Sequence, residues 1–221
     1  MSPQYKPGPP SGLEFDFEWR ITLFTLILLP MMISLGFWQL QRLEWKEAIL
    51  ADIDARIAAA PVALPLSVSS ADDNYRGVAV RATPTGEELH VLVSGTAAGT
   101  GFRVISKMEM RPGVNIMVDL GLLPIEDKNA LPSAFETDII GNLIWPDDKN
   151  SSTPEPDIAA NTWFARDVTA MSQHLGTLPI MIVARSSSVQ DPRVTPLPIN
   201  SANIKCKTKV VLFAFCEIHI M

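Results

Sequence analysis

The chain has 221 residues and a formal net charge of -6 at pH 7. This acidic balance argues against the basic surface that nucleic acids require, so we expect no nucleic-acid partner. The 18 prolines favour turns and extended segments over a helical bundle.

Residues 1–18 are rich in proline, glycine and serine, and we expect them to form a disordered tail. Residues 19–41 follow, and the uncharged stretch between Arg20 and Arg42 is about 20 residues long, enough to cross a bilayer core. Trp19 and Trp38 lie near its two ends, where indole rings favour the headgroup layer. The segment therefore predicts a transmembrane helix. The alternative, a cleaved signal peptide, would need a basic leader and a small-residue exit. Counting lysines and arginines on the two sides leaves the orientation open.

Residues 42–60 continue the helical pattern as an amphipathic extension. Leu43, Leu50 and Ile57 recur at seven-residue spacing, and Pro61 stops the helix.

The hydrophobic period then changes, and residues 61–199 predict a β-rich domain. Turn residues at Thr83–Gly86, Gly95–Gly101 and Arg111–Gly113 separate the first candidate strands. The expected strands are Arg76–Ala82, His90–Ser94, Phe102–Met110, Val114–Leu123, Asp138–Trp145 and Pro179–Arg185.

One short helix is expected between the last two strands. Asp167 is a candidate N-cap and Gly176 a candidate C-terminal stop. The fold class is therefore a membrane-anchored α+β protein, with an N-terminal transmembrane helix before a mostly antiparallel β domain. That domain is either barrel-like or a small sandwich, and it carries the short helix.

Residues typical of catalysis form no familiar pattern. The three histidines, His90, His174 and His219, are interpreted as surface or helix-terminal residues. The sequence has no H-x-x-x-H or C-x-x-C spacing, which argues against a zinc site. No nucleophile is paired with a base, so we predict that the chain is not an enzyme.

Three polar and aromatic clusters stand out: residues 36–46, 75–78 and 161–167. In the first, Trp38, Arg42 and Trp45 share one helix face, and Gly36 would let another helix approach closely. Each cluster also has a structural interpretation, as an interfacial belt, a strand entry and a capped helix entry.

Taken in order, the clusters resemble the Surfeit locus 1 family. GFWQLQRLEWK resembles its G-x-W-Q-x-x-R-x-x-W-K pattern, and YRGV, VDLGLLP (residues 118–124) and NTWFARDVTAM resemble three further motifs. The positions matching those motifs are Gly36, Trp38, Gln39, Arg42, Trp45, Lys46, Tyr75, Arg76, Gly121, Pro124, Asn161, Trp163, Arg166 and Asp167.

The resemblance implies an assembly factor for cytochrome c oxidase that assists the supply of haem a to subunit I. Subunit I and the haem a synthesis machinery are the implied partners, and haem a is the implied cofactor. Trp38 and Arg42 are candidates to hold a haem edge. The family has two transmembrane helices flanking a domain in the periplasm or the mitochondrial intermembrane space. The resemblance thus implies an inner-membrane protein whose residues 1–18 lie in the cytoplasm or matrix.

Residues 200–221 depart from the family pattern. The family's second helix opens with a histidine, the candidate axial haem ligand, followed by tyrosine and tryptophan. Here Lys205, Lys207 and Lys209 interrupt instead, and the apolar stretch from Val210 is too short to span a bilayer. We expect an atypical tail in place of the second helix, from a frameshift or a real variant, and His219 is not assigned the ligand role.

Overall fold

The structure is a computed structural model that describes residues 19–96, 99–132 and 136–199. The expected tails at 1–18 and 200–221 lie outside these residues. The chain divides into two compact units, Met1–Ala48 and Ile49–Met221. The other domain boundaries expected from the sequence stay predictions.

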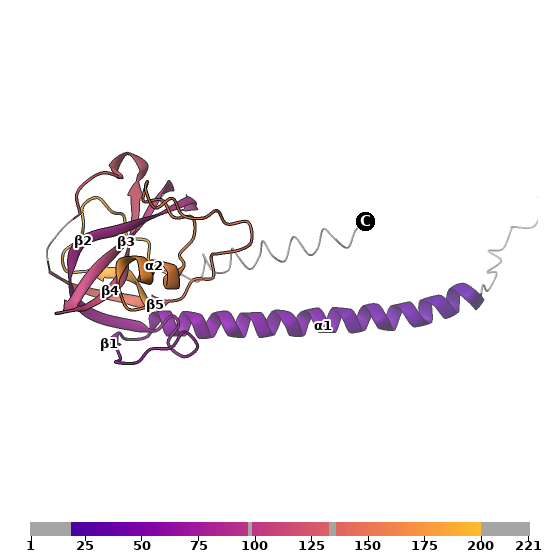
Figure 1. Cartoon of the computed structure of the whole chain (residues 1–221). Coiled ribbons are helices and arrows are strands. Elements are labelled where there is room, and N and C mark those ends of the chain that lie inside the picture. The colour runs from indigo at the N-terminus through magenta and orange to yellow at the C-terminus, as the bar shows by residue number, and fades with distance from the viewer. Residues whose placement is uncertain (1–18, 97–98, 133–135, 200–221) are drawn as a thin grey trace, which may run out of the picture. The chain divides into compact units, whose positions relative to one another are not determined.

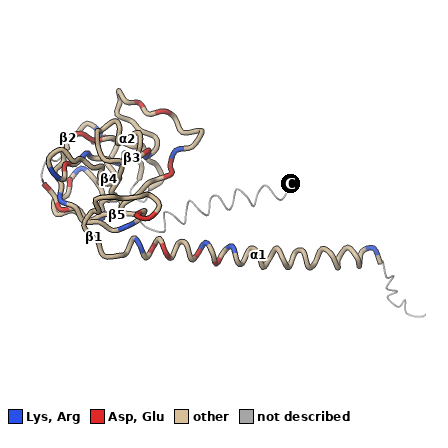
Figure 2. The backbone as a smooth tube through the Cα atoms, turned by 60° about the horizontal axis from the view of Figure 1, so that its bottom comes forward, with Lys and Arg blue, Asp and Glu red and all other residues tan. Residues whose placement is uncertain are grey.

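The first unit consists of the N-terminal part of helix α1, Trp19–Ala58 (Figure 1). None of the 40 residues of α1 is buried, and the helix continues through Pro30. Figure 2 shows a long uncharged stretch in the N-terminal part of α1, after which charged residues resume toward the C-terminal end of the helix. By length and composition α1 is the candidate membrane span among the described residues, and we take it as a membrane anchor. The helix ends at Ala58 rather than at residue 60.

The second unit is built on one mixed sheet of six strands. The strands are β1 (Val62–Ala63), β2 (Gly77–Thr96), β3 (Gly99–Arg111), β4 (Val114–Pro124), β5 (Thr137–Ile144) and β6 (Met181–Ser187). Their order is β1-β2-β3-β4-β6-β5, and a further pairing of β2 with β5 closes the sheet. The barrel-like alternative is therefore confirmed. Strands β4 and β6 are parallel, whereas the other pairs in the closed ring are antiparallel.

Strand β2 corrects the prediction of a turn at Thr83–Gly86 between two separate strands. The chain stays extended there, and the strand changes partner instead. Gly77–Ala82 pairs with β5, and the residues from Thr83 onward pair with β3. A bulge between Pro84 and Glu88 absorbs the turn residues, with Gly86 at φ +90°. Such a bulge lets one long strand bend around the corner of a small barrel.

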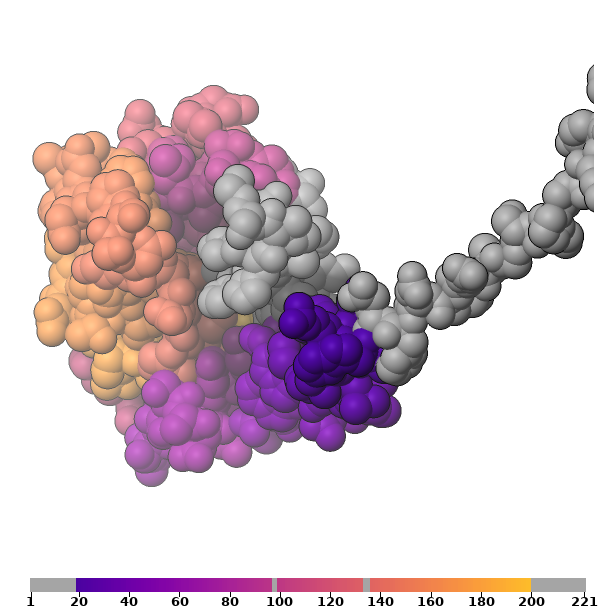
Figure 3. All heavy atoms as spheres, turned by 90° about the vertical axis from the view of Figure 1, so that its right-hand side faces the viewer, coloured from indigo at the N-terminus to yellow at the C-terminus, as the bar shows by residue number. Residues whose placement is uncertain are grey.

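Helix α2 (Val168–Leu175) forms as predicted. The Asp167 side chain accepts a hydrogen bond from the Ala170 N–H, and Gly176 ends the helix at φ +64°. A short 3-10 helix, η1 (Ile125–Asp127), follows β4. In Figure 3 the chain after β5, in orange and yellow, forms one side of the second unit.

Alternate residues of the strands supply the two larger of the three hydrophobic clusters. All five strands of the ring contribute to the barrel interior, for example Val80 on β2 and Val118 on β4. Their sequence neighbours face the other way, and Met117 packs against Met171 of α2. Burial on both faces explains why β4 and the first half of β6 are mostly apolar in sequence.

Candidate functional site

The first motif, residues 36–46, lies at the C-terminal end of the apolar stretch of α1 and is mostly solvent-exposed. The guanidinium carbon of Arg42 lies 5.4 Å from the centroid of the Trp38 ring, a cation–π contact one helical turn long. Trp45 is 63% exposed, and a Cβ added to Gly36 would meet nothing within 4 Å. Gln39 is exposed as well, and Lys46 is partly exposed. These residues form an open helix surface rather than part of a core.

Tyr75 and Arg76 build the corner that leads into β2. Tyr75 adopts a left-handed conformation with φ +69°, which is uncommon for a residue with a side chain. Its N–H donates to the Leu143 carbonyl at 2.8 Å, and its own carbonyl accepts from Asn142 Nδ2 at 3.0 Å. Arg76 pairs with the buried carboxylate of Asp73. The motif therefore has a structural role in this chain.

The same corner holds the last turn of α1. The Ile57 carbonyl accepts hydrogen bonds from Arg185 Nη1 at 3.0 Å and from Asn142 Nδ2 at 3.3 Å. A Cβ on Gly77 would lie 3.1 Å from the Ala59 carbonyl oxygen, so the backbones approach closely there. Side chains from β5 and β6 thus donate hydrogen bonds to a carbonyl in the last turn of α1, which has no partner within the helix.

Asn161 and Trp163 extend the sheet along β2. The Trp163 N–H donates to the His90 carbonyl, and the Leu92 N–H donates to the Trp163 carbonyl, both at 2.8 Å. Asn161 Nδ2 donates to the Glu88 carbonyl at 2.9 Å. The Trp163 side chain is 4% exposed, and its Nε1 has no hydrogen-bond partner among the described residues.

Arg166 reaches a fully buried carboxylate on β4. Asp119 is 0% exposed, and its Oδ2 lies 2.7 Å from Arg103 Nε and 3.8 Å from Arg166 Nη1. Arg166 Nε also donates to Asp148 Oδ2 at 2.7 Å. A carboxylate so buried needs charged partners, and the two arginines supply them.

The cluster of Asp119, Arg103 and Arg166 holds the segment that follows β6 in place. Asp119 Oδ1 accepts from the Gly121 N–H at 3.2 Å, and Arg103 Nη2 donates to the Leu197 carbonyl at 3.1 Å. Leu122 and Thr195 exchange two backbone hydrogen bonds, both of 2.8 Å. Gly121 is required there because an added Cβ would lie 2.2 Å from the Thr195 carbonyl oxygen. Pro124, the last motif residue on β4, ends the strand before η1.

A second ionic network lies on the inner side of β2. Glu88 Oε1 lies 2.9 Å from His90 Nε2, and Glu88 Oε2 lies 3.0 Å from Arg193 Nη2. Arg193 also binds Asp191 Oδ2 at 2.7 Å and the Ala130 carbonyl at 2.6 Å. The network therefore ties the segment after β6 and the loop after η1 to β2.

Burial and ion pairing shift the pKa values of Glu88 and Arg193 in opposite directions. Burial raises the pKa of the Glu88 carboxyl, but hydrogen bonds from His90 and Arg193 outweigh it and hold that pKa below its usual value. Burial lowers the pKa of Arg193, whereas Asp191 and Glu88 raise it well above its usual value. Both groups therefore stay charged at neutral pH.

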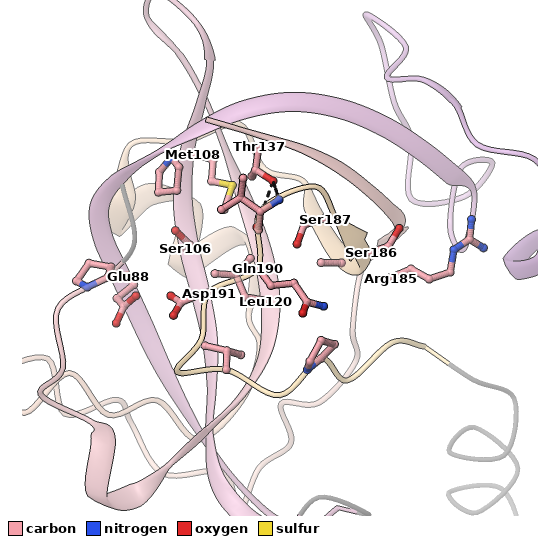
Figure 4. A pocket seen from close by; sticks show the side chains of 16 residues that line it. Glu88, Ser106, Met108, Leu120, Thr137, Arg185, Ser186, Ser187, Gln190 and Asp191 are labelled. Atoms are coloured by element: carbon pink, nitrogen blue, oxygen red, sulfur yellow. Dashed lines mark hydrogen bonds between the residues drawn. The ribbon is translucent and has the colours of Figure 1, made fainter. Parts of the chain in front are cut away.

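A pocket of about 640 Å³, including its solvent-open part, adjoins this network (Figure 4). Glu88 and Asp191 contribute carboxylates to its wall, while Met108 and Leu120 contribute apolar surface. In Figure 4 Arg185 extends away from these carboxylates, in keeping with its bond to the Ile57 carbonyl.

The structure brings only some of the sequence-predicted site residues together. Arg166 and Gly121 meet around Asp119, whereas Tyr75 and Arg76 lie at the separate corner beside α1. The residues of the α1 motif, Gly36 to Lys46, all lie in the first unit.

Sequence reasoning missed Arg103, Glu88 and Arg193. A charged residue inside an apolar strand, as in FRVIS, was the available signal for Arg103. His90, interpreted as a surface or helix-terminal residue, is instead buried with 4% exposure. It is covered because Phe102 packs on its ring and Glu88 binds its Nε2. Among the described residues no group of three or more histidine, cysteine or acidic side chains is arranged to hold a metal ion.

Comparison with known proteins gives a consistent result. The model of the SURF1 family matches residues 26–212, which is most of the chain. Surfeit locus protein 1 of Rattus norvegicus is 27% identical over 187 residues, covering 75% of this chain and 61% of that protein. The Homo sapiens protein of the same name is 28% identical over 189 residues, covering 75% and 63%.

A bacterial relative matches over more of its own length. The SURF1-like protein of Rickettsia felis is 25% identical over 188 residues, covering 82% of this chain and 83% of that protein. The chain spans about three fifths of the length of the mammalian relatives, as their coverage of 61% and 63% shows. The matched region runs from the membrane helix through the barrel, and the chain therefore belongs to the SURF1 family.

Proposed function

We propose that this protein is a membrane-anchored assembly factor for cytochrome c oxidase, which assists the delivery of haem a to subunit I or its insertion there. It acts by binding and positioning, not as a catalyst. The observation that carries this proposal is the family match, which covers both the α1 anchor and the barrel. The family resemblance supplies the oxidase as the target.

The exposed surface around Trp38 and Arg42 is the proposed contact with partners inside the membrane. Trp38 is 49% exposed, although it is a large aromatic residue. Buried aromatic and arginine side chains dominate binding in many interfaces. We propose that this surface meets subunit I and the haem a synthesis machinery.

The residues of α1 fit haem a only in part. The Arg42 guanidinium suits a propionate carboxylate, because arginine pairs with carboxylates in a bidentate manner. Helix α1 contains no histidine, so it offers no imidazole to the iron. His90 is buried beside Glu88 on the inner side of the barrel wall. We therefore propose a role for Arg42 toward the haem edge and assign no axial ligand.

The proposed location is the inner membrane of a bacterium or a mitochondrion. The barrel would lie in the periplasm or intermembrane space, and the N-terminus in the cytoplasm or matrix. A protease-protection assay on sealed vesicles tests this orientation. Cleavage of the barrel in vesicles whose cytoplasmic face is outward would contradict it.

Removing the gene tests the oxidase proposal directly. We expect a strain without it to assemble less cytochrome c oxidase, measured as haem a content and oxidase activity of the membranes. Normal values of both would refute the proposal.

A scaffold that binds a partner protein without haem is the second candidate function, and the absence of histidine from α1 favours it. Purifying the full chain with haem a and recording its absorption spectrum separates the two. A bound haem a spectrum supports the first candidate, and a haem-free protein that still restores oxidase supports the second.

The α1 helix offers a matched pair of arginines for a sharper test. Arg42 lies over Trp38 at 5.4 Å and Arg20 over Trp19 at 5.8 Å, so both ends of the apolar stretch carry the same contact. We expect Arg42→Ala to lower oxidase activity in a complemented deletion strain without reducing membrane insertion. Arg20→Ala should leave the activity near normal. Equal loss from both variants would show that the contact serves only to anchor the helix.

A further inference from the structure

One face of α1 carries exposed residues at a regular spacing. They recur at alternating steps of three and four positions, and all lie in the first unit: Leu29, Met32, Gly36, Gln39 and Leu43. Residues so spaced line up along a helix, as in the contact between two helices that wrap around each other. We call these five residues the Gln39 face. Each residue adds about 100° of rotation, so Trp38 lies on a different side of the helix.

Two residues of the Gln39 face suit a second helix better than lipid. Apolar side chains gain little by leaving lipid for another helix, so small and polar residues drive helix association in a membrane. A Cβ added to Gly36 would meet nothing within 4 Å, which leaves the backbone open to close approach. Gln39 lies in the uncharged stretch, and its amide has no hydrogen-bond partner among the described residues. An amide on a facing helix would satisfy it.

Charged residues flank the Gln39 face on its two sides. Arg42 lies on one flank and Glu47 on the other. Both are exposed, and neither forms an ion pair within the described part of the chain. In a parallel pair of helices, a residue on one flank meets the residue five positions later on the opposite flank of the partner helix. Arg42 would therefore meet Glu47 of a second copy, and twofold symmetry repeats the pair. The charges of this helix are thus complementary to those of its own copy.

We propose that α1 forms a parallel homodimer through the Gln39 face, with a second copy of this chain as the occupant. Gly36 lets the two backbones approach, and the two Gln39 amides exchange hydrogen bonds across the twofold axis. Two Arg42–Glu47 pairs flank the contact where charged residues resume. The cation–π contact of Arg42 with Trp38 leaves N–H groups for the carboxylate, because a guanidinium has five. The proposal goes beyond the oxidase-assembly function and does not depend on it.

The experiment measures energy transfer between full chains in liposomes. Chains with a donor or an acceptor fluorophore at the N-terminus are reconstituted together in phosphatidylcholine at a series of protein-to-lipid ratios. We expect transfer that saturates with protein density and rises linearly with the acceptor fraction, as a dimer requires. Transfer no greater than random proximity at every density would overturn the proposal, and the face would then belong to lipid or to a helix of another protein.

The two glutamines of this region form a matched pair of variants. Gln39→Leu removes the proposed hydrogen bonds, and we expect a dissociation constant about three- to thirtyfold larger. Gln41→Leu removes the same amide at a position about 200° around the helix and should leave the constant unchanged. Equal effects of the two substitutions would show that Gln39 does not lie in the contact and would overturn the proposed face.

Charge reversal tests the parallel register. We expect Glu47→Arg or Arg42→Glu alone to weaken the dimer about tenfold at low salt, because both symmetric pairs become repulsive. The double variant restores opposite charges and should recover the dimer, and higher salt should reduce these differences. Glu44→Arg makes the same charge change on another side of the helix and should have no effect. A double variant as weak as either single variant would refute the Arg42–Glu47 pairing.

Discussion

Replacing Gly121 with alanine tests whether β4 holds the segment that leaves the barrel. Gly121 has φ +126°, and an added Cβ would lie 2.2 Å from the Thr195 carbonyl oxygen and 2.8 Å from the Pro196 Cα. Both contacts are with backbone, so no side chain can move aside. The segment must therefore separate from β4, and the two hydrogen bonds between Leu122 and Thr195 are lost.

The expected cost has two parts. Holding alanine at a positive φ costs about 1–3 kcal/mol. Losing two backbone hydrogen bonds costs about 0.5–1.5 kcal/mol each. The free energy of unfolding should therefore fall by about 2–6 kcal/mol. Urea unfolding of the full chain in detergent, followed by tryptophan fluorescence, measures this change.

Gly113 provides the matched control. It has φ +79°, but a Cβ there would meet nothing within 4 Å. Gly113→Ala should therefore show the backbone strain alone. Hydrogen exchange adds a local readout, since the Leu122 and Thr195 amides should lose protection only in Gly121→Ala. Equal destabilisation by both variants, with both amides still protected, would refute the idea that β4 holds the segment after β6 in place.

Two further predictions concern charged side chains of the barrel. Arg185→Met removes the charged hydrogen bond to the Ile57 carbonyl and should lower the free energy of unfolding by about 1.5–3 kcal/mol in urea. Arg81→Met breaks an exposed ion pair on β2 and should cost much less; equal losses would contradict the special role of Arg185. The lowered pKa of Glu88 means that its ion pairs stabilise the folded state above the usual glutamate pKa of about 4.3. That stability should be lost as the pH falls from there through the lowered folded value, which urea midpoints at several pH values will show. Glu88→Gln should flatten this dependence, and an unchanged slope would refute the assignment.

Local signals in the sequence were enough for several elements. Asp167 and Gly176 mark the ends of α2 because capping depends on residues within one or two turns. Gly113 marks the β3–β4 hairpin for the same reason, since a tight turn needs a positive φ at one position. The period of the apolar residues distinguished α1 from the strands that follow.

The closure of the barrel could not be predicted in this way. Thr83–Gly86 contains residues typical of turns, yet it lies inside β2, where the strand stops pairing with β5 and begins to pair with β3. This change of partner depends on strands that follow much later in the chain. The buried ion pairs have the same origin. Arg193 is 105 residues from Glu88, so no local pattern connects them. The family motifs contain both Arg166 and its buried partner Asp119, in two separate segments, but no local pattern shows that the two side chains meet.

Arg185 and Arg103 both bind a main-chain carbonyl: Arg185 donates a hydrogen bond to that of Ile57, and Arg103 donates one to that of Leu197. Because every residue has a main-chain carbonyl, these hydrogen bonds do not depend on which side chain stands at position 57 or 197. Substitution tolerance should therefore be asymmetric. A saturation-mutagenesis library should accept many residues at positions 57 and 197, as far as local packing allows, and few at 185 and 103. The two ends of the barrel domain can thus vary in sequence while staying fixed in place.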